Sequence, residues 1–358
     1  MRVLLIGPHW RAGWTESTRD GLLALGCKVQ VFYYNQTAGR QAASRTRARL
    51  LQKFTGASLQ TPNPVRQLLW ILNGRQLHVQ LIAAVRAAQP ELVLVLKGET
   101  ILPATLRAIK RMAHAPLLAA WYSDNPFVFN ERDPYWLVPS GLPAYDHSFV
   151  FDRSYFAQLA ARGARQITFL PCACDPALYH PEPAELVRRS GLVSSVCFIG
   201  TFSPARGVML EGLAGIDDIA IWGPGWQPTL KRLRGKLAPN IFRGEGLPPG
   251  QVSHAYQSAP IIINTHGPQT KLGGLNTRAF EVPACGAFQL MDYVPEMEPL
   301  LQPGHDVAVY RTPQEAGAVA REYLADPEAR QRIARQGHAR ALAEHTYRHR
   351  MQTLLAAL

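Results

Sequence analysis

Short apolar runs alternate with amphipathic stretches from the start of the chain. Residues 2–7 are mostly apolar, which predicts a buried strand, and the spacing of apolar positions over 17–25 predicts a helix that Gly26 ends. Residues 28–34 predict a second strand. The chain therefore begins with a β-α-β unit.

The same alternation continues through the first half of the chain. It predicts helices at 77–88, 103–112 and 152–162 and strands at 92–96, 117–122, 148–151 and 167–170. Asp152 caps the last of these helices, and Gly163 ends it. Strands that alternate with helices form a parallel, doubly wound sheet.

A proline-rich stretch, residues 171–185, ends this alternation, and a second series of strands follows. Strands are expected at 196–200, 219–222, 240–243, 259–264 and 287–291, with helices such as 251–257 and 277–285 between them. The tail is helical. Thr312 and Glu315 form a capping box around Pro313, and Asp326 starts the next helix ahead of Pro327.

The fold class that follows is α/β, with two Rossmann-like domains built on doubly wound parallel sheets and a C-terminal helical tail. We expect a first domain at 1–175, a linker at 176–190, a second domain at 191–335 and a C-terminal helix at 336–358 that packs back toward the first domain. Ligands of open α/β sheets bind beyond the carboxyl ends of the strands. Two such domains that face each other therefore create a cleft lined by strand-end loops.

Composition agrees with a globular protein and argues against several other classes. Apolar residues make up 47% of the 358 residues and charged residues 18%. Apolar runs such as 92–96 and 261–263 are much shorter than the roughly 20 residues that span a bilayer, and the first run lacks a signal-peptide cleavage site. We expect a cytoplasmic protein without a transmembrane segment.

The five cysteines are odd in number and lie mostly beside predicted strands, which favours reduced, buried thiols over a disulfide framework. Cys172 and Cys174 are spaced like half of a metal site. No second cysteine pair and no spaced histidine pair completes four ligands. We expect no metal.

A formal net charge of +12 indicates an anionic partner. The excess lies in two segments, 40–53 and 330–350, and the second holds six arginines against one acid, Glu344. Neither segment interleaves aromatic residues in a stacking pattern, so nucleic acid is not favoured. An anionic lipid surface at the inner face of the membrane, a phosphate-bearing acceptor and solvated helix faces stay open.

Residues 261–292 form the most informative stretch: a strand, a glycine-rich loop, an amphipathic helix and a further strand. Gly273 and Gly274 let backbone N–H groups approach a ligand, and Lys271 adds a positive charge. The helix that starts near Asn276 directs its positive end at the loop. The spacing matches neither a P-loop nor a dinucleotide fingerprint, but it indicates a phosphate site.

The runs NTRAFE (276–281) and ACGA (284–287) resemble the R-x-FE-x-x-ACG signature of CgeB-like glycosyltransferases, which are related to the large GT-B family 4. The C-terminal tail is similar to that family's pattern as well. The resemblance covers about 196–355, and the first domain matches in its general pattern and in 121–126. It implies a GT-B architecture and the transfer of a sugar from a nucleotide-diphosphate sugar.

By the resemblance, Glu281 takes the place of the glutamate that binds the donor ribose, and a carboxylate can accept hydrogen bonds from ribose hydroxyls. Related enzymes often carry another glutamate eight residues earlier, where this chain has Gly273. That departure leaves open the contact to the donor sugar and the choice between inversion and retention.

Basic side chains near the loop complete the expected donor site. Arg206, after the strand at 196–200, and Lys271 would neutralise the diphosphate as the sugar departs, a role otherwise met by a metal, so the donor substrate is the only ligand expected. Gly223 ends another strand near the nucleotide, and Trp226 either packs on the base or belongs to the core. The nucleotide-sugar site expected from the sequence is Arg206, Gly223, Lys271, Gly273, Gly274, Leu275, Asn276, Thr277, Arg278 and Glu281.

Strand-end loops of the first domain are the candidate acceptor site. His9 follows the first strand, and Asp124 follows the strand at 117–122. Inverting GT-B enzymes often use such a histidine as general base, oriented by an aspartate, so His9 and Asp124 form a candidate catalytic pair. Glu99, at another strand end, is a second carboxylate candidate. Capping or core roles are the alternative.

Two other functions stay open. A sugar-nucleotide epimerase of the same fold would turn over the donor without any acceptor. A non-catalytic nucleotide-sugar-binding protein would bind the donor without transfer. The acceptor of a transferase would be a protein, a glycan, a lipid-linked molecule or a small molecule.

Overall fold

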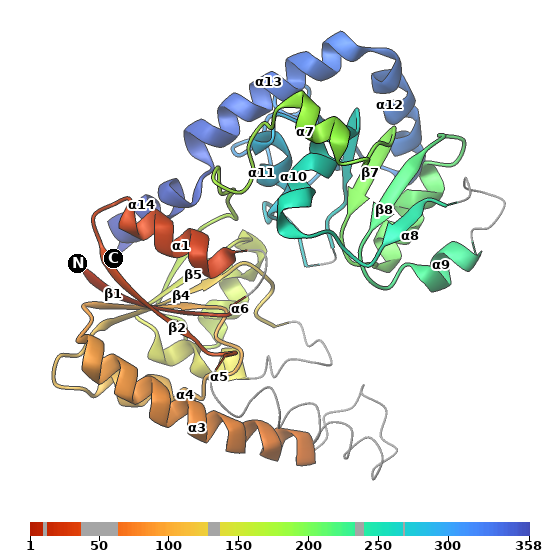
Figure 1. Cartoon of the computed structure of the whole chain (residues 1–358). Helices are drawn as coiled ribbons and strands as arrows, with labels where there is room; N and C mark the ends of the chain where they lie inside the picture. Colours follow the sequence, from red (N-terminus) through yellow and green to blue (C-terminus); the bar gives the residue numbers. More distant parts are fainter. Residues whose placement is uncertain (10–12, 37–63, 128–136, 233–239, 268) are drawn as a thin grey trace. The chain divides into compact units, whose positions relative to one another are not determined.

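The computed structural model describes residues 1–9, 13–36, 64–127, 137–232, 240–267 and 269–358 (Figure 1). The chain divides into two compact units. Unit 1 comprises Met1–Leu170 and Met351–Leu358, and unit 2 comprises Pro171–Arg350. The expected domain boundaries stay predictions. The basic segment 40–53 lies outside the described residues. None of the described helices combines the length and apolarity needed to cross a membrane.

Unit 1 is built on a parallel sheet of six strands in the order β2-β1-β3-β4-β5-β6. The strands are β1 (Arg2–Gly7), β2 (Lys28–Tyr33), β3 (Leu92–Leu96), β4 (Leu117–Tyr122), β5 (His147–Val150) and β6 (Gln166–Phe169). Every residue of β3 is buried, as expected of a central strand covered by helices on both faces.

Helices cover both faces of this sheet. α1 (Trp14–Leu23) lies on one face, and α3 (Pro64–Ala88) and α4 (Pro103–Lys110) lie on the other (Figure 1). The single helix predicted at 152–162 is instead two segments, because Asp152 accepts a hydrogen bond from the Ser154 N–H and starts a 3₁₀ turn. The remaining helical segments are α5 (Leu137–Gly141), η1 (Leu142–Ala144), η2 (Arg153–Tyr155) and α6 (Phe156–Ala161).

Unit 2 repeats the design with the strand order β12-β11-β10-β7-β8-β9, again all parallel. The strands are β7 (Val196–Ile199), β8 (Ile219–Trp222), β9 (Phe242–Gly244), β10 (Ile261–Asn264), β11 (Gln289–Asp292) and β12 (Ala308–Tyr310). β12 was not expected, because its three residues are too few for a periodic signal.

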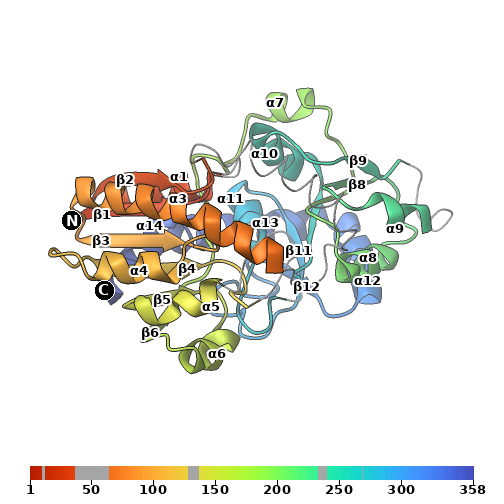
Figure 2. The ribbon, with the colours of Figure 1, turned by 90° about the horizontal axis from the view of Figure 1, so that it is seen from below.

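The helices of unit 2 are α7 (Ala184–Arg189), α8 (Pro204–Gly212), α9 (Gln227–Arg232), α10 (Pro249–Ser258), α11 (Arg278–Ala284), α12 (Pro313–Ala325) and α13 (Pro327–Glu344), and α14 (Tyr347–Ala357) runs from unit 2 into unit 1. The predicted caps are confirmed: Thr312 accepts from the Glu315 N–H and Asp326 from the Ala329 N–H. α8 and α12 lie side by side (Figure 2), and a Cβ on Gly212 would come within 1.8 Å of the Pro313 carbonyl oxygen. α7 lies inside the stretch expected as linker.

Part of the basic tail is structural. Arg350 is 6% exposed, and its Nε donates to the carbonyl oxygens of Pro171 and Cys172 at 3.1 and 2.9 Å. Arg330 donates to the Leu324 carbonyl at 3.0 Å, at the end of α12. Arg350 and Arg330 are therefore bound to backbone carbonyls rather than lying on solvated helix faces.

Each sheet has one position where the order of its strands reverses. In unit 1 it lies between β1 and β3, and in unit 2 between β7 and β10. The loops that follow two such strands diverge to opposite faces and leave a crevice at the carboxyl ends, where ligands of this architecture bind. A ligand site is therefore expected among the residues that follow β1, β3, β7 and β10.

Candidate functional site

Arg206 links the two loops that flank the reversal point of unit 2. It lies in the first turn of α8, where the Ser203 side chain caps the helix. Its Nε donates to the carbonyl oxygen of Thr265, after β10, at 3.2 Å, and its Nη1 donates to that of Thr201, after β7, at 2.6 Å. Burial, and then the neighbouring Arg278, lower the pKa of Arg206 to about 10. Burial and the charge of Arg278 therefore destabilise the charged form of Arg206, and a bound anion would stabilise it.

Arg278 is the second cation of the site. The guanidinium carbons of Arg278 and Arg206 lie 5.0 and 5.5 Å from the ring centre of Phe198, so both charges face one aromatic ring. Arg278 Nη1 donates to Asn264 Oδ1 at 2.7 Å, but its Nε is buried without a hydrogen-bond partner among the described residues. Two adjacent guanidinium groups, one with an unused donor, form a site for an anion.

An amide pair positions the start of α11. Asn264, the last residue of β10, and Asn276 exchange hydrogen bonds of 2.9 and 3.1 Å through their side chains. Asn276 Oδ1 also accepts from the Ala279 N–H at 3.1 Å, so it caps the helix, as Thr277 does not. The strand end therefore fixes where Arg278 and Glu281 lie.

Glycines allow the loops of the site to approach closely. A Cβ on Gly200 would come within 2.6 Å of Arg278 Nη2, and one on Gly223 within 2.1 Å of the Gly200 carbonyl oxygen. Gly223 has a φ of 134°, which only glycine adopts readily. Gly273 and Gly274 are buried in the glycine-rich loop, and Lys271 lies on the same loop with an exposed side chain. Arg278, which belongs to the site expected from the sequence, lies beside Arg206. The expected role of Lys271 as the second cation stays a prediction.

Glu281 lies in α11 with part of its surface accessible. Burial raises the pKa of its carboxyl to about 7, against the opposing effects of Arg278 and of hydrogen bonds from Thr277 and Tyr179. The Tyr179 ring stacks on Tyr256 with centroids 6.4 Å apart. A ligand that donates hydrogen bonds would stabilise the ionised form of this carboxylate.

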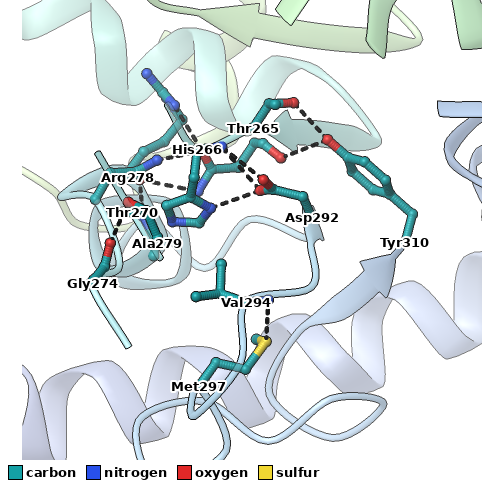
Figure 3. A network of polar contacts seen from close by, with 12 residues as sticks. Thr265, His266, Thr270, Gly274, Arg278, Ala279, Asp292, Val294, Met297 and Tyr310 are labelled. Atoms are coloured by element: carbon teal, nitrogen blue, oxygen red, sulfur yellow. Dashed lines mark hydrogen bonds and ion pairs between the residues drawn. The ribbon is translucent and has the colours of Figure 1, made fainter. Parts of the chain in front are cut away.

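The sequence did not indicate the network of polar side chains that Figure 3 shows beside Arg278. His266 Nδ1 lies 2.7 Å from Asp292 Oδ1. The backbone N–H of His266 donates to both oxygens of that carboxylate at 3.0 Å. The Thr265 hydroxyl lies 2.5 Å from that of Tyr310. Each of these residues stands at or just after a strand end, which is the signal that would have found them.

Trp226 belongs to the core, and the alternative of packing on a base is wrong. It is fully buried, its Nε1 donates to the Gly200 carbonyl oxygen at 2.8 Å, and its ring meets those of Phe198 and Phe202 edge to face. Its role is to support the loop after β7 from beneath.

In unit 1 the structure does not pair His9 with Asp124. His9 Nδ1 lies 2.8 Å from Glu16 Oε1, while Asp124 Oδ2 lies 3.8 Å from Lys97 Nζ. The reason is local: Glu16 stands in the first turn of α1, directly after the loop that carries His9. Residues 10–12 of that loop lie outside the described residues.

Glu99, the second carboxylate candidate of unit 1, is 4% exposed and accepts from the Tyr34 hydroxyl at 2.8 Å. The five cysteines are all buried, and none forms a disulfide. Within the described ranges, no group of three or more His, Cys, Asp or Glu side chains is arranged to hold a metal ion.

Comparisons with known proteins bear on the family and the fold. Residues 206–356 match the family described as glycosyl transferase-like. The spore protein CgeB of Bacillus subtilis (strain 168) is 22% identical over 277 residues, which cover 74% of this chain and 81% of that protein. The resemblance to CgeB-like glycosyltransferases is thereby confirmed.

Solved structures with the same fold include sucrose-phosphate synthase from Thermosynechococcus elongatus, with a TM-score of 0.66, 14% identity and coverage of 100% of this chain and 98% of that one. Anabaena Alr3699/HepE in complex with UDP-glucose has a TM-score of 0.60 and 14% identity, with both chains covered completely. The fold is therefore GT-B, as the sequence predicted.

Proposed function

We propose that this chain, a GT-B protein whose residues 206–356 are glycosyl transferase-like, transfers a sugar from a nucleotide-diphosphate sugar to an acceptor. The observation that carries the proposal is the pair of guanidinium groups, Arg206 and Arg278, at the strand reversal of unit 2, with the carboxylate of Glu281 on the same helix as Arg278. Two cations and one carboxylate suit the diphosphate and the ribose of such a donor.

The diphosphate is assigned to Arg206 and Arg278. An anion between them removes their mutual repulsion and gives the unused Arg278 Nε a hydrogen-bond acceptor. When the bond from sugar to phosphate breaks, negative charge grows on the departing phosphate, and fixed cations in a site shielded from water stabilise that charge. We propose that they replace a metal ion in this reaction.

The ribose is assigned to Glu281. Its ionised carboxylate accepts hydrogen bonds from the ribose hydroxyls, and these bonds compensate for the burial that raises its pKa to about 7. Tyr179, which also hydrogen-bonds to this carboxylate, holds it in position.

The acceptor is assigned to the strand-end loops of unit 1. There His9 is the general base of an inverting transfer, and Glu16 fixes its tautomer because Nδ1 faces that carboxylate at 2.8 Å. His9 Nε2 is then the nitrogen that takes the proton of the acceptor hydroxyl. Glu99 and Asp124, predicted as catalytic carboxylates, are assigned here to the binding of acceptor hydroxyls.

Calorimetric titration with UDP, GDP, dTDP and their glucose conjugates tests the proposal, and UDP-glucose is the first choice because HepE was crystallised with it. We expect saturable binding that Arg206→Met and Arg278→Met weaken by about 100-fold each. Arg189→Met is the matched control, since this arginine is an exposed residue of unit 2 with a surface ion pair to Glu185. Equal affinity in all three variants would refute the assignment.

Gly273 favours one second candidate, a protein that binds the nucleotide sugar without transferring it. The position offers no carboxylate for the donor sugar. Donor binding without release of free nucleoside diphosphate, across a panel of glycan, peptide and lipid acceptors, would support this second function.

A further inference from the structure

His266 is a buried imidazole. One of its ring nitrogens contacts a carboxylate, and the other has no hydrogen-bond partner among the described residues. Its side chain is 3% exposed, Nδ1 is engaged by Asp292 at 2.7 Å, and Nε2 has no hydrogen-bond partner in the part of the chain that the structure describes. A buried polar atom without a partner is unfavourable and rare in native proteins, so one in a candidate site indicates a partner that binds there.

A second buried nitrogen without a hydrogen-bond partner among the described residues lies in the polar network of Figure 3. Arg278 Nε is also buried without a partner among the described residues, and Arg278 reaches the network through Asn264. This N–H can only donate a hydrogen bond. His266 Nε2 is different: with Nδ1–H directed at Asp292, it accepts a hydrogen bond in the neutral ring and donates one only when the ring is protonated. A ligand rich in acceptor oxygens therefore satisfies both nitrogens when His266 is an imidazolium.

Figure 3 shows the His266 ring with the Asp292 carboxylate on one side and the loop residues Thr270 and Gly274 on the other. Thr270 Oγ1 donates to the Gly274 carbonyl at 2.6 Å, which closes the loop on itself. Because Nε2 is shielded from solvent, contact with a ligand requires this loop to shift enough to admit one oxygen atom.

The charges around His266 decide its state when a ligand binds. Asp292 is the carboxylate on its ring, and the electrostatic neighbours of that carboxylate are Arg206 of α8 and Tyr310 of β12, with Arg278 of α11 adjoining both. A bound diphosphate adds negative charge to this cluster, and the Asp292 carboxylate is already in place to hold an imidazolium.

We infer that His266 is a third cationic contact for the donor diphosphate: it takes up a proton as the donor binds, Nε2–H then donates to a phosphate oxygen, and Asp292 is the positioning residue that holds the protonated ring. This inference rests on the proposed function and adds a residue to it. The proton comes from solvent and stays on the imidazole, so no bond of the donor changes in this step.

Proton counting tests the inference. The bridging phosphates of a nucleotide sugar carry no proton near neutral pH, so any proton taken up on binding enters the protein. Titration of UDP-, GDP- or dTDP-glucose, whichever binds, in buffers of different ionisation enthalpy gives that number directly. The measurement is made in the Glu281→Gln background, because Glu281, with a pKa of about 7, releases protons when ribose binds it.

We expect net uptake of a fraction of one proton at pH 7.5, abolished by His266→Gln together with a loss of affinity of about 10- to 100-fold. Asp292→Asn should abolish the uptake although His266 remains, an effect that a purely structural role of Asp292 would not produce. His305→Gln is the matched control, because His305 forms the same 2.7 Å contact with an aspartate, Asp306, elsewhere in unit 2.

Three results overturn the inference. If His266→Gln binds the donor with the same affinity and takes up the same number of protons as the parent, His266 is not part of the site. Arg206 and Arg278 would remain in it. Reduced affinity without any uptake in the parent would mean a neutral His266 that accepts a sugar hydroxyl. If no nucleotide sugar binds the wild-type chain, the proposed function falls as well. Thermal midpoints identify a variant that does not fold, in which case Asp292→Asn decides.

Discussion

At the strand reversal of unit 1 two carboxylates are hydrogen-bonded by neighbouring side chains, whereas at that of unit 2 two guanidinium groups lie together. In unit 1, Glu16 and Glu99 hydrogen-bond to His9 and Tyr34. In unit 2, Arg206 and Arg278 face one phenyl ring, and buried nitrogens remain without partners among the described residues. The same strand order thus carries different side chains in the two units, which is why we propose the acceptor for unit 1 and the anionic donor for unit 2.

The largest effect is expected at Arg278. Arg278→Met removes a charge, the unused Nε donor and the bond to Asn264, so turnover should fall by about 10²- to 10³-fold in steady-state assays with a donor that binds. Arg189→Met, on the exposed surface of the same unit, should match the wild type. Near-normal turnover of Arg278→Met would mean that unit 2 is not the cationic half of the comparison.

Glu16→Gln tests the carboxylate half. Loss of the charge that orients His9 should lower kcat by about 10²-fold, because the imidazole loses its fixed tautomer and the stabilisation of its protonated form. Donor affinity should not change. If Asp124→Asn lowers kcat more than Glu16→Gln does, Asp124 is the carboxylate that acts with His9.

Gly223→Ala tests the close approach of the loops after β7 and β8. The added Cβ would lie 2.1 Å from the Gly200 carbonyl oxygen at a φ of 134°, so the free energy of unfolding should fall by about 2 kcal/mol or more. Gly246→Ala, where nothing lies within 4 Å of the new atom, is the control. Urea denaturation of both variants measures the difference, and equal midpoints would show that the loops are not packed this closely.

A pH dependence of stability and of donor affinity should identify Glu281 as part of the site. Burial raises its pKa to about 7, above the ordinary value of 4.5, so the folded state holds the proton more tightly than the unfolded chain. Ionisation therefore costs stability as pH rises from 4.5 through 7, and donor affinity, which needs the carboxylate, should rise over the upper part of this window. Glu281→Gln should flatten both profiles. Parallel curves for the variant and the wild type would exclude Glu281 from the ribose contact.

The smallest effect is expected from metal removal. With Arg206 and Arg278 as the charges that stabilise the departing diphosphate, activity after EDTA treatment should equal that of untreated protein. Loss of activity that magnesium or manganese restores would refute metal independence.

Local signals carried most of the fold. The apolar runs of β1, β3 and β10, the caps at Asp152, Thr312 and Asp326, and the motif around Glu281 could all be predicted, because each depends on residues within one turn or one strand. The three-residue β12 and the helix α7 within a proline-rich stretch gave no periodic signal.

The site was predictable only in part, because its contacts are non-local. Arg206 reaches Thr265 across 59 positions, and His266 meets Asp292 across 26, and each residue by itself is an ordinary side chain after a strand. His9 shows the opposite error: the prediction looked for a distant partner, although Glu16 stands seven positions away. Strand order decides which of these residues meet, and sequence patterns do not specify strand order.

The most direct test of the account is one titration of a nucleotide-diphosphate sugar, with UDP-glucose first, into the wild-type chain and into Arg206→Met, Arg278→Met and Arg189→Met. The account predicts saturable binding to the wild type and to Arg189→Met, and affinity reduced by about 100-fold in the other two. Binding that survives both site substitutions, or no binding to the wild type by any nucleotide sugar, would contradict it.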